Sequence, residues 1–168
     1  LNINLETLPL KGEHNYSNIM AAVKIAELFN INHDTINNSL KSFSPLPHRL
    51  ELIGKYNNSL IYNDSKATNI DAMLVALKSF KEKIVLIIGG IDKGESNFCK
   101  PIGLHKDMIR FVSCYGESGK CIQGQIKDMV RTEYTYLFSD AISNAINNLQ
   151  GDDSLLLSPG CASFEYEG

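Results

Sequence analysis

The apolar run from residue 84 to 88, Ile-Val-Leu-Ile-Ile, constrains the fold more than any other feature of the chain. A β-branched run without polar alternation is typical of a strand that is buried on both faces of a parallel sheet. Segments of strand and helix character alternate around it. We expect strands at 49–56, 59–63, 111–115, 134–138 and 154–158, and helices at 70–80, 99–108, 119–130 and 140–149. This alternation predicts an α/β fold with a Rossmann-like, doubly wound, mostly parallel sheet.

A domain boundary is expected at Pro45-Leu46-Pro47, because two prolines in three positions break a helix and stiffen a connector. Before it, residues 1–10 alternate like a strand, and helices are expected from about residue 13 to 29 and from 33 to 43. The predicted domains are therefore 1–44 and 45–168. The chain does not begin with Met, which suggests that it starts in the middle of a longer gene product.

Composition excludes several classes of protein. The net charge is -3 and no run of Lys or Arg occurs, so a nucleic-acid partner is not expected. No apolar stretch approaches the ~20 residues of a membrane helix, and no signal peptide is visible, so we expect a cytoplasmic protein. The four cysteines form no Cys-x-x-Cys pair, which predicts free and mostly buried thiols rather than a metal site.

Three loops are expected to carry the function, because doubly wound sheets bind ligands beyond the carboxyl ends of their strands. They are 64–69, 89–94 and 159–163. In the first, Lys66 stands among polar side chains at the start of a helix, where an anion is well received. Helix capping by Asp, Ser or Thr could explain one of these polar residues but not the lysine.

The other two loops give weaker signals. Gly89 and Gly90 allow a sharp turn beside a ligand, and Lys93 could meet an anion, although such turns are common. Ser163 offers a hydroxyl in a segment of small residues, where a plain turn is an equal alternative.

Further candidates lie before these loops. Asn15 and Asn18 are three residues apart, so they share a helix face and could read the edge of a purine; alternatively Asn15 is an N-cap. Arg49 follows Pro47 closely and could clamp a phosphate or form an ion pair with Glu51.

The segment Gly116-Glu-Ser-Gly-Lys120 is not interpreted as a phosphate-binding P-loop. That motif requires Gly at position 114 and Ser or Thr at 121, and this chain has Cys114 and Cys121. Lys120 is expected to be a solvated residue of a first helical turn.

Taken in order, five motifs make the chain similar to the Mur ligases. They are Gly-x-His-Asn-x-x-Asn from residue 12, Leu-Pro-His-Arg-x-Glu from 46, Asn-Asp-Ser-Lys-Ala-Thr-Asn from 63, Gly-Gly-x-x-Lys from 89 and Leu-Ser-Pro-x-Cys-Ala-Ser-Phe from 157. The resemblance runs from about residue 9 to 164. It is strongest with the branch that adds D-glutamate to UDP-N-acetylmuramoyl-L-alanine, and the block at 63–69 is its most specific part.

The resemblance implies an ATP-dependent, amide-forming ligase of peptidoglycan precursor synthesis that works through an acyl phosphate. It makes 1–44 the end of a central ATPase domain and 45–168 a C-terminal Rossmann-like domain that binds the amino acid. The P-loop, a carbamylated lysine and the Mg²⁺ ligands of the family would lie upstream. The chain is therefore expected to be inactive alone and to need the remaining ligase domains in cis.

The resemblance also implies roles for single residues, and it favours adenine binding over the capping interpretation of Asn15. The ATP-binding residues would be Asn15 and Asn18 at adenine, Arg49 at the phosphates and Asp64 near the ribose. The catalytic residue would be Lys66. The D-glutamate residues would be Thr68, Lys93 and Ser163.

The chain departs from the family pattern at its end, where Glu165-Tyr-Glu-Gly168 stands in place of Asp-Gln-Phe-Lys and an aromatic that helps to close the D-glutamate pocket. Three alternatives stay open: another Mur ligase, a ligase similar to folylpolyglutamate synthase, and a non-catalytic Rossmann-like binding module.

Overall fold

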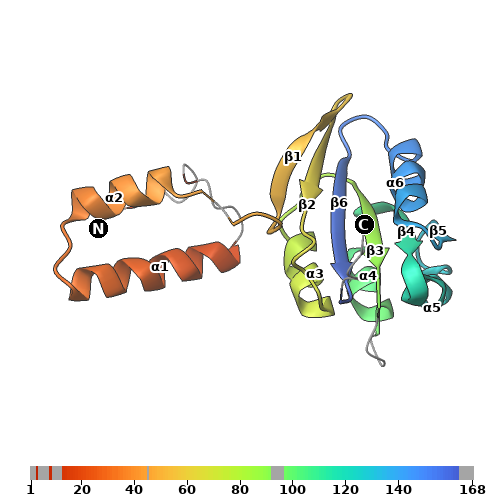
Figure 1. Cartoon of the computed structure of the whole chain (residues 1–168), viewed down its shortest axis with the longest axis horizontal. Coiled ribbons are helices and arrows are strands. Elements are labelled where there is room, and N and C mark those ends of the chain that lie inside the picture. Colours follow the sequence, from red (N-terminus) through yellow and green to blue (C-terminus); the bar gives the residue numbers. More distant parts are fainter. Residues whose placement is uncertain (1–2, 4–7, 9–12, 45, 92–96, 163–168) are drawn as a thin grey trace. The chain divides into compact units, whose positions relative to one another are not determined.

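The protein is described by a computed structural model that covers residues 3, 8, 13–44, 46–91 and 97–162 (Figure 1). The chain divides into two compact units, Leu1–Pro47 and His48–Gly168. The division falls at the end of the proline-containing segment, close to the predicted boundary at 44/45. The assignment of the first unit to an ATPase domain stays a prediction.

The first unit contains two helices, α1 (Glu13–Leu28) and α2 (His33–Ser42). Asn30, with a φ of 56°, reverses the chain between them, and the side chain of Asn32 accepts a hydrogen bond from the backbone N–H of Thr35 (2.8 Å) and so caps α2. The apolar residues Leu8, Ile19, Val23 and Ile36 pack together. Apart from Ile3 and Leu8, the strand expected at 1–10 lies outside the described residues.

The second unit begins with an antiparallel hairpin of β1 (Glu51–Tyr56) and β2 (Ser59–Asn63). Asn57 adopts a φ of 52°, as the prediction of a tight turn requires. The first strand begins at Glu51 rather than at Arg49, because His48 and Leu50 have positive φ values of 66° and 47° and cannot continue a strand.

Four parallel strands follow: β3 (Ile84–Gly89), β4 (Ile109–Tyr115), β5 (Thr132–Thr135) and β6 (Ser154–Gly160). The sheet has the order β1-β2-β6-β3-β4-β5, and every pairing except the hairpin is parallel. All residues of β3 are buried, which confirms the interpretation of the apolar run. The predicted α/β, mostly parallel architecture is confirmed.

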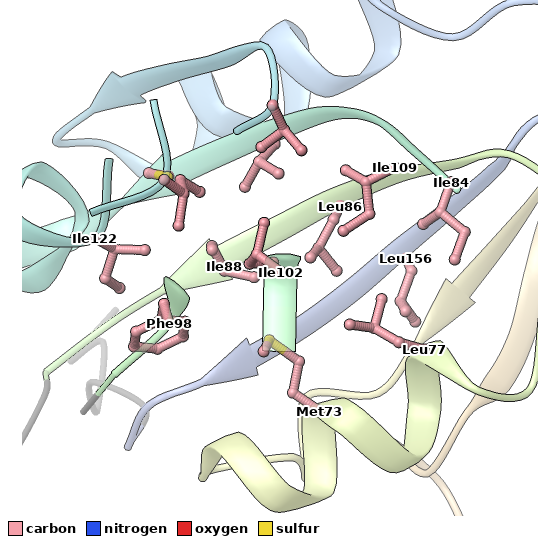
Figure 2. Close-up of a cluster of buried hydrophobic side chains, with 14 of the residues drawn as sticks. Met73, Leu77, Ile84, Leu86, Ile88, Phe98, Ile102, Ile109, Ile122 and Leu156 are labelled. Atoms are coloured by element: carbon pink, nitrogen blue, oxygen red, sulfur yellow. The ribbon is translucent and has the colours of Figure 1, made fainter. Parts of the chain in front are cut away.

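Helices cover both faces of this sheet. One face packs on α3 (Ile70–Leu77), α4 (Cys99–His105) and α5 (Gly116–Ile126), and Figure 2 shows this cluster, in which Met73, Phe98 and Ile122 meet the inward residues of β3. The other face packs on α6 (Phe138–Asn147) through Ala141 and Ala145. Such two-sided burial is the main source of stability for a parallel sheet.

Other predicted bounds also differ from the structure, among them those of α5 and β5. Helix α5 begins at Gly116 rather than at 119, with Gly116 at a φ of 75°. Strand β5 covers 132–135 rather than 134–138. The second error arose because Phe138 looks like a strand residue in sequence, yet it starts α6 and packs against Tyr115 with ring centroids 4.9 Å apart.

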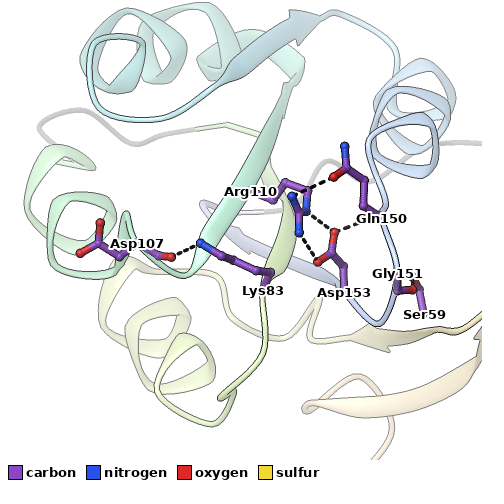
Figure 3. Close-up of polar contacts among 7 residues, drawn as sticks. All are labelled: Ser59, Lys83, Asp107, Arg110, Gln150, Gly151 and Asp153. Carbon is purple, nitrogen blue, oxygen red and sulfur yellow. Dashed lines mark hydrogen bonds and ion pairs between the residues drawn. The ribbon is translucent and has the colours of Figure 1, made fainter.

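The amino ends of the strands are braced by polar contacts (Figure 3). Arg110 at the start of β4 forms a bidentate ion pair with Asp153 just before β6, and it also donates to Gln150. The hydrogen bond to Asp153 raises the pKa of Arg110. These contacts lie at the end of the sheet opposite to the expected ligand edge, so we assign them to the fold. No helix in the described part of the chain is long and apolar enough to cross a bilayer.

Candidate functional site at the carboxyl edge of the sheet

The three loops predicted to converge do so because β2, β6 and β3 are neighbours in the sheet. Their ends are joined by backbone hydrogen bonds from Asp64 N–H to Leu157 C=O (2.8 Å), from Gly160 N–H to Ala67 C=O (2.9 Å) and from Ile91 N–H to Ala162 C=O (3.0 Å). We call residues 64–69, 89–91 and 159–162 the carboxyl edge. The predicted convergence of the three loops is confirmed for these residues.

The carboxyl edge is closely packed at Gly90. Its φ is 126°, and a Cβ there would lie 2.5 Å from the carbonyl oxygen of Ala162. Only glycine fits this approach without a backbone shift. Gly90 therefore allows two loops to pack closely together. The sequence alone did not decide between this structural role and a turn beside a ligand.

The loop after β2 divides into a buried and an exposed part. Asp64 is buried, with one carboxylate oxygen accepting from the Leu50 N–H (3.0 Å) and the other from the Ser158 hydroxyl (2.8 Å). Lys66 and Thr68 are exposed. Asn69 caps α3 by accepting from the Ala72 N–H (2.9 Å), whereas Asp, Ser or Thr was expected to supply this cap. Lys66 has no such structural role for its side chain in the described contacts, and an anion can reach it.

Arg49 is exposed at the apex of a tight turn beside this loop. The flanking residues His48 and Leu50 are both left-handed, which costs roughly 1–2 kcal/mol for each residue with a Cβ. The turn is held by Glu51, whose carboxylate accepts from the His48 N–H (2.8 Å), and by Lys66, whose N–H donates to the His48 carbonyl (3.1 Å). Within the described part of the chain, the Glu51 carboxylate forms its contacts with His48 and not with Arg49.

Helix α1 carries two other predicted site residues. It begins at Glu13, so Asn15 lies inside the first turn and is not its N-cap; that alternative was wrong. Asn18 is exposed, three residues further along the same helix. Their predicted contact with adenine stays a prediction. Lys93 and Ser163 lie outside the described residues, so their predicted contacts with D-glutamate also stay predictions.

The rejected P-loop segment is helical from its first residue, so it has no loop that could wrap around a phosphate. A Cβ on Gly119 would lie 2.9 Å from the Tyr134 ring, which shows that this glycine serves packing. Lys120 is exposed in the first turns of α5, as expected.

Among the described residues no group of three or more His, Cys, Asp or Glu side chains could hold a metal ion. Asp64, the acid of the carboxyl edge, already receives two hydrogen bonds. The exposed groups at the described part of this edge thus include the ammonium of Lys66 and the hydroxyl of Thr68, which suit an anionic ligand.

Sequence reasoning missed Ser158 as a site residue. Its side chain is completely buried and bonded to Asp64, 94 positions away. A serine at the end of an apolar strand predicts a buried side-chain hydrogen bond, because buried hydroxyls need a partner. The identity of that partner could not be predicted, since it comes from another strand.

The four cysteines are free, as predicted, but Cys121 is exposed and Cys99 is only half buried. Burial raises the pKa of the Cys114 thiol to about 11. We therefore expect 5,5′-dithiobis(2-nitrobenzoate) at pH 8 to label Cys121 rapidly and Cys114 only after unfolding, since the thiolate is the reactive form. Peptide mapping measures this, with Cys121→Ser as the control that removes the rapid phase. Equal labelling rates in the folded chain would contradict the description.

These features define a class: a doubly wound α/β domain in which the exposed Lys66 at the carboxyl edge and the exposed Arg49 in the adjacent turn lie on segments joined by a backbone hydrogen bond. More particularly, the chain belongs to the Mur ligase family. The family pattern described as "Mur ligase, glutamate ligase domain" matches residues 48–161.

Curated relatives agree with this membership. A UDP-N-acetylmuramoylalanine–D-glutamate ligase of Salinibacter ruber is 40% identical over 96% of this chain and 35% of its own length. The enzyme of the same name from Cytophaga hutchinsonii is 38% identical over 96% of this chain and 36% of its own length. The chain thus spans little more than a third of the relatives that it matches.

Solved structures share the fold at low identity. The UDP-N-acetylmuramate-alanine ligase MurC of Thermotoga maritima aligns with a TM-score of 0.68 and 19% identity, over 92% of this chain and 36% of that one. Escherichia coli FolC, in a complex with ADP, aligns with a TM-score of 0.66 and 16% identity, over 94% and 38%. At these identities the likeness supports the fold and not a particular substrate.

Proposed function

We propose that this chain is the C-terminal part of a cytoplasmic, ATP-dependent ligase that joins D-glutamate to UDP-N-acetylmuramoyl-L-alanine. The observation that carries the proposal is the identity of 36–40% with relatives of that activity over nearly the whole chain. Structural neighbours such as MurC and FolC share the fold at only 16–19% identity. The activities of these neighbours are therefore weaker candidates for this chain than the activity of the D-glutamate ligases.

The proposed reaction transfers the γ-phosphoryl group of ATP to the L-alanine carboxylate and leaves ADP. The amine of D-glutamate then attacks the acyl carbon, the C–O bond to phosphate breaks, and the amine loses a proton as the amide forms. Both steps develop negative charge on oxygens, which fixed cations stabilise. Arg49 and Lys66 are exposed on loops joined through the His48 carbonyl, so they are suited to hold phosphoryl oxygens.

The remaining roles are part of the same proposal. Thr68, Lys93 and Ser163 would bind the carboxylates of D-glutamate, as anion-binding hydroxyl and ammonium groups can. The amides of Asn15 and Asn18 would bind adenine.

ATP and Mg²⁺ place different demands on this chain. The exposed cations fit a polyphosphate, whereas the described residues supply no carboxylate cluster for a divalent ion. When bound, Mg²⁺ neutralises phosphate charge during transfer. We therefore propose that the Mg²⁺ ligands come from the other domains of the ligase. In this proposal Asp64 lies near the ribose and does not bind the metal.

An activity assay with two preparations tests the proposal. The full-length enzyme should release phosphate and form product only when ATP, UDP-N-acetylmuramoyl-L-alanine and D-glutamate are all present. The isolated 168-residue chain should form none, because the proposed metal and nucleotide groups of the other domains are absent. Mass spectrometry of the product gives the readout.

The amino-acid control is a panel of L-glutamate, L-alanine, L-lysine and diaminopimelate with the same full-length enzyme. Preference for one of these would assign the chain to another ligase of the family. Turnover by the isolated chain would show that the upstream domains are dispensable. A full-length enzyme without any turnover would favour a non-catalytic binding module.

A further inference from the structure

Ser158 is a buried residue that none of the proposed substrate contacts uses. It lies near the end of β6 with 0% of its surface exposed, and its hydroxyl donates to Asp64 at 2.8 Å. Asp64 is itself buried, with 8% of the residue exposed, and its carboxylate accepts from the Leu50 N–H at 3.0 Å. One buried carboxylate thus links the end of a central strand to the turn that carries Arg49.

The turn needs such a link because its conformation is unfavourable for its residues. His48 and Leu50 have φ values of 66° and 47°, and a left-handed leucine persists only where its surroundings hold it. The bond from the Leu50 N–H to Asp64 holds the backbone of this residue from outside the turn, while its side chain packs against the core cluster.

The same turn fixes Lys66. The Lys66 N–H donates to the His48 carbonyl at 3.1 Å, and Asn63 forms a side-chain hydrogen bond with His48 Nδ1 at 2.8 Å. The backbones of Arg49 and Lys66 are therefore held in one relative position. Their exposed side chains depend on this position to meet the same anion.

We propose that Ser158 is a positioning residue that acts through Asp64 to hold the turn of Arg49 in the conformation that binds the nucleotide phosphates. This inference rests on the proposed function only for the identity of the ligand as ATP. Ser158 touches no substrate in this scheme. It orients the carboxylate, the carboxylate fixes the Leu50 N–H, and the turn then presents the guanidinium.

The structure offers a matched control in Ser113. This serine lies in the middle of β4, is also 0% exposed, and its hydroxyl has no hydrogen-bond partner within the described part of the chain. Replacing either serine by alanine removes one buried oxygen from a strand of the same sheet. Only the Ser158 substitution removes a bond to the turn.

The test measures the dissociation constant of the Mg²⁺ complex of AMP-PNP, a non-hydrolysable ATP analogue, by calorimetry with the full-length enzyme. Ser158→Ala should weaken binding roughly tenfold, which corresponds to about 1.4 kcal/mol. Ser113→Ala should change it less than about twofold. In turnover, the KM for ATP should rise with Ser158→Ala while the KM for D-glutamate stays within about twofold, a split that a general loss of stability would not produce.

A double-mutant cycle with Arg49→Ala tests the route of the effect. Adding Ser158→Ala to Arg49→Ala should weaken nucleotide binding by a clearly smaller factor than it does in the wild-type enzyme, because the guanidinium that Ser158 positions is already absent and only the effects through Asp64 and Lys66 remain. Ser158→Cys keeps a weak donor, should weaken binding about two- to fivefold, and provides the test if Ser158→Ala does not fold.

Wild-type affinity in a folded Ser158 variant overturns the inference, and so do effects that multiply in the Arg49→Ala background. An enzyme that binds the nucleotide but does not use D-glutamate would contradict the proposed function while leaving this measurement valid. An enzyme that does not bind the nucleotide overturns both.

Discussion

Replacing Gly89 by alanine is expected to lower the free energy of unfolding of this chain by more than about 3 kcal/mol. Gly89 ends β3 with a φ of 139°, a conformation that residues with a Cβ rarely adopt. An added Cβ would lie 2.0 Å from the carbonyl oxygen of Tyr115, which is a backbone atom of the neighbouring strand. The clash can be relieved only by separating β3 from β4 at the carboxyl edge.

Urea denaturation followed by circular dichroism measures this loss, and Gly124→Ala is the control. Gly124 is exposed in α5, and a Cβ there would meet no atom within 4 Å. Alanine is the better helix former, so this variant should be more stable by about 0.5–1 kcal/mol. A Gly89 variant as stable as the Gly124 variant would show that β3 and β4 are not packed as described.

Replacing Lys66 by alanine in the full-length enzyme is expected to lower kcat/KM by roughly 10³-fold, because a fixed cation near the phosphoryl oxygens stabilises the developing charge. The fold should be unaffected. The Lys66 side chain is exposed, and the hydrogen bonds of this residue in the described part of the chain come from its backbone, which the substitution preserves.

The matched control is Lys120→Ala, which removes an exposed lysine from the start of α5, the helix that follows β4. Because we place Lys120 outside the site, its removal should change kcat/KM less than about twofold. Steady-state phosphate release and thermal melting are measured on both variants. Equal losses of activity would remove Lys66 from the catalytic role, and a lowered melting temperature for Lys66→Ala would assign it to the fold.

The order of strands and helices could be predicted because it depends on local periodicity. The buried run at 84–88 and the turn at Asn57 have their own signatures in the sequence, and both were confirmed. Bounds failed where a distant partner decided them. Phe138 joined α6 because its ring packs on Tyr115, and strand β1 started late because the Asp64 carboxylate holds Leu50 in a left-handed turn.

The sequence by itself determined the α/β class, the three loops that meet at the carboxyl edge, and the motifs that place the chain among the Mur ligases. Only the tertiary structure decided how Asp64 is used. Its partners Leu50 and Ser158 lie 14 and 94 positions away in the chain. Hydrogen bonds of that separation leave no local pattern, because they form only when the sheet brings β2 beside β6. For the same reason, the structure and not the sequence revealed that Arg49 and Lys66 are held by one strained turn.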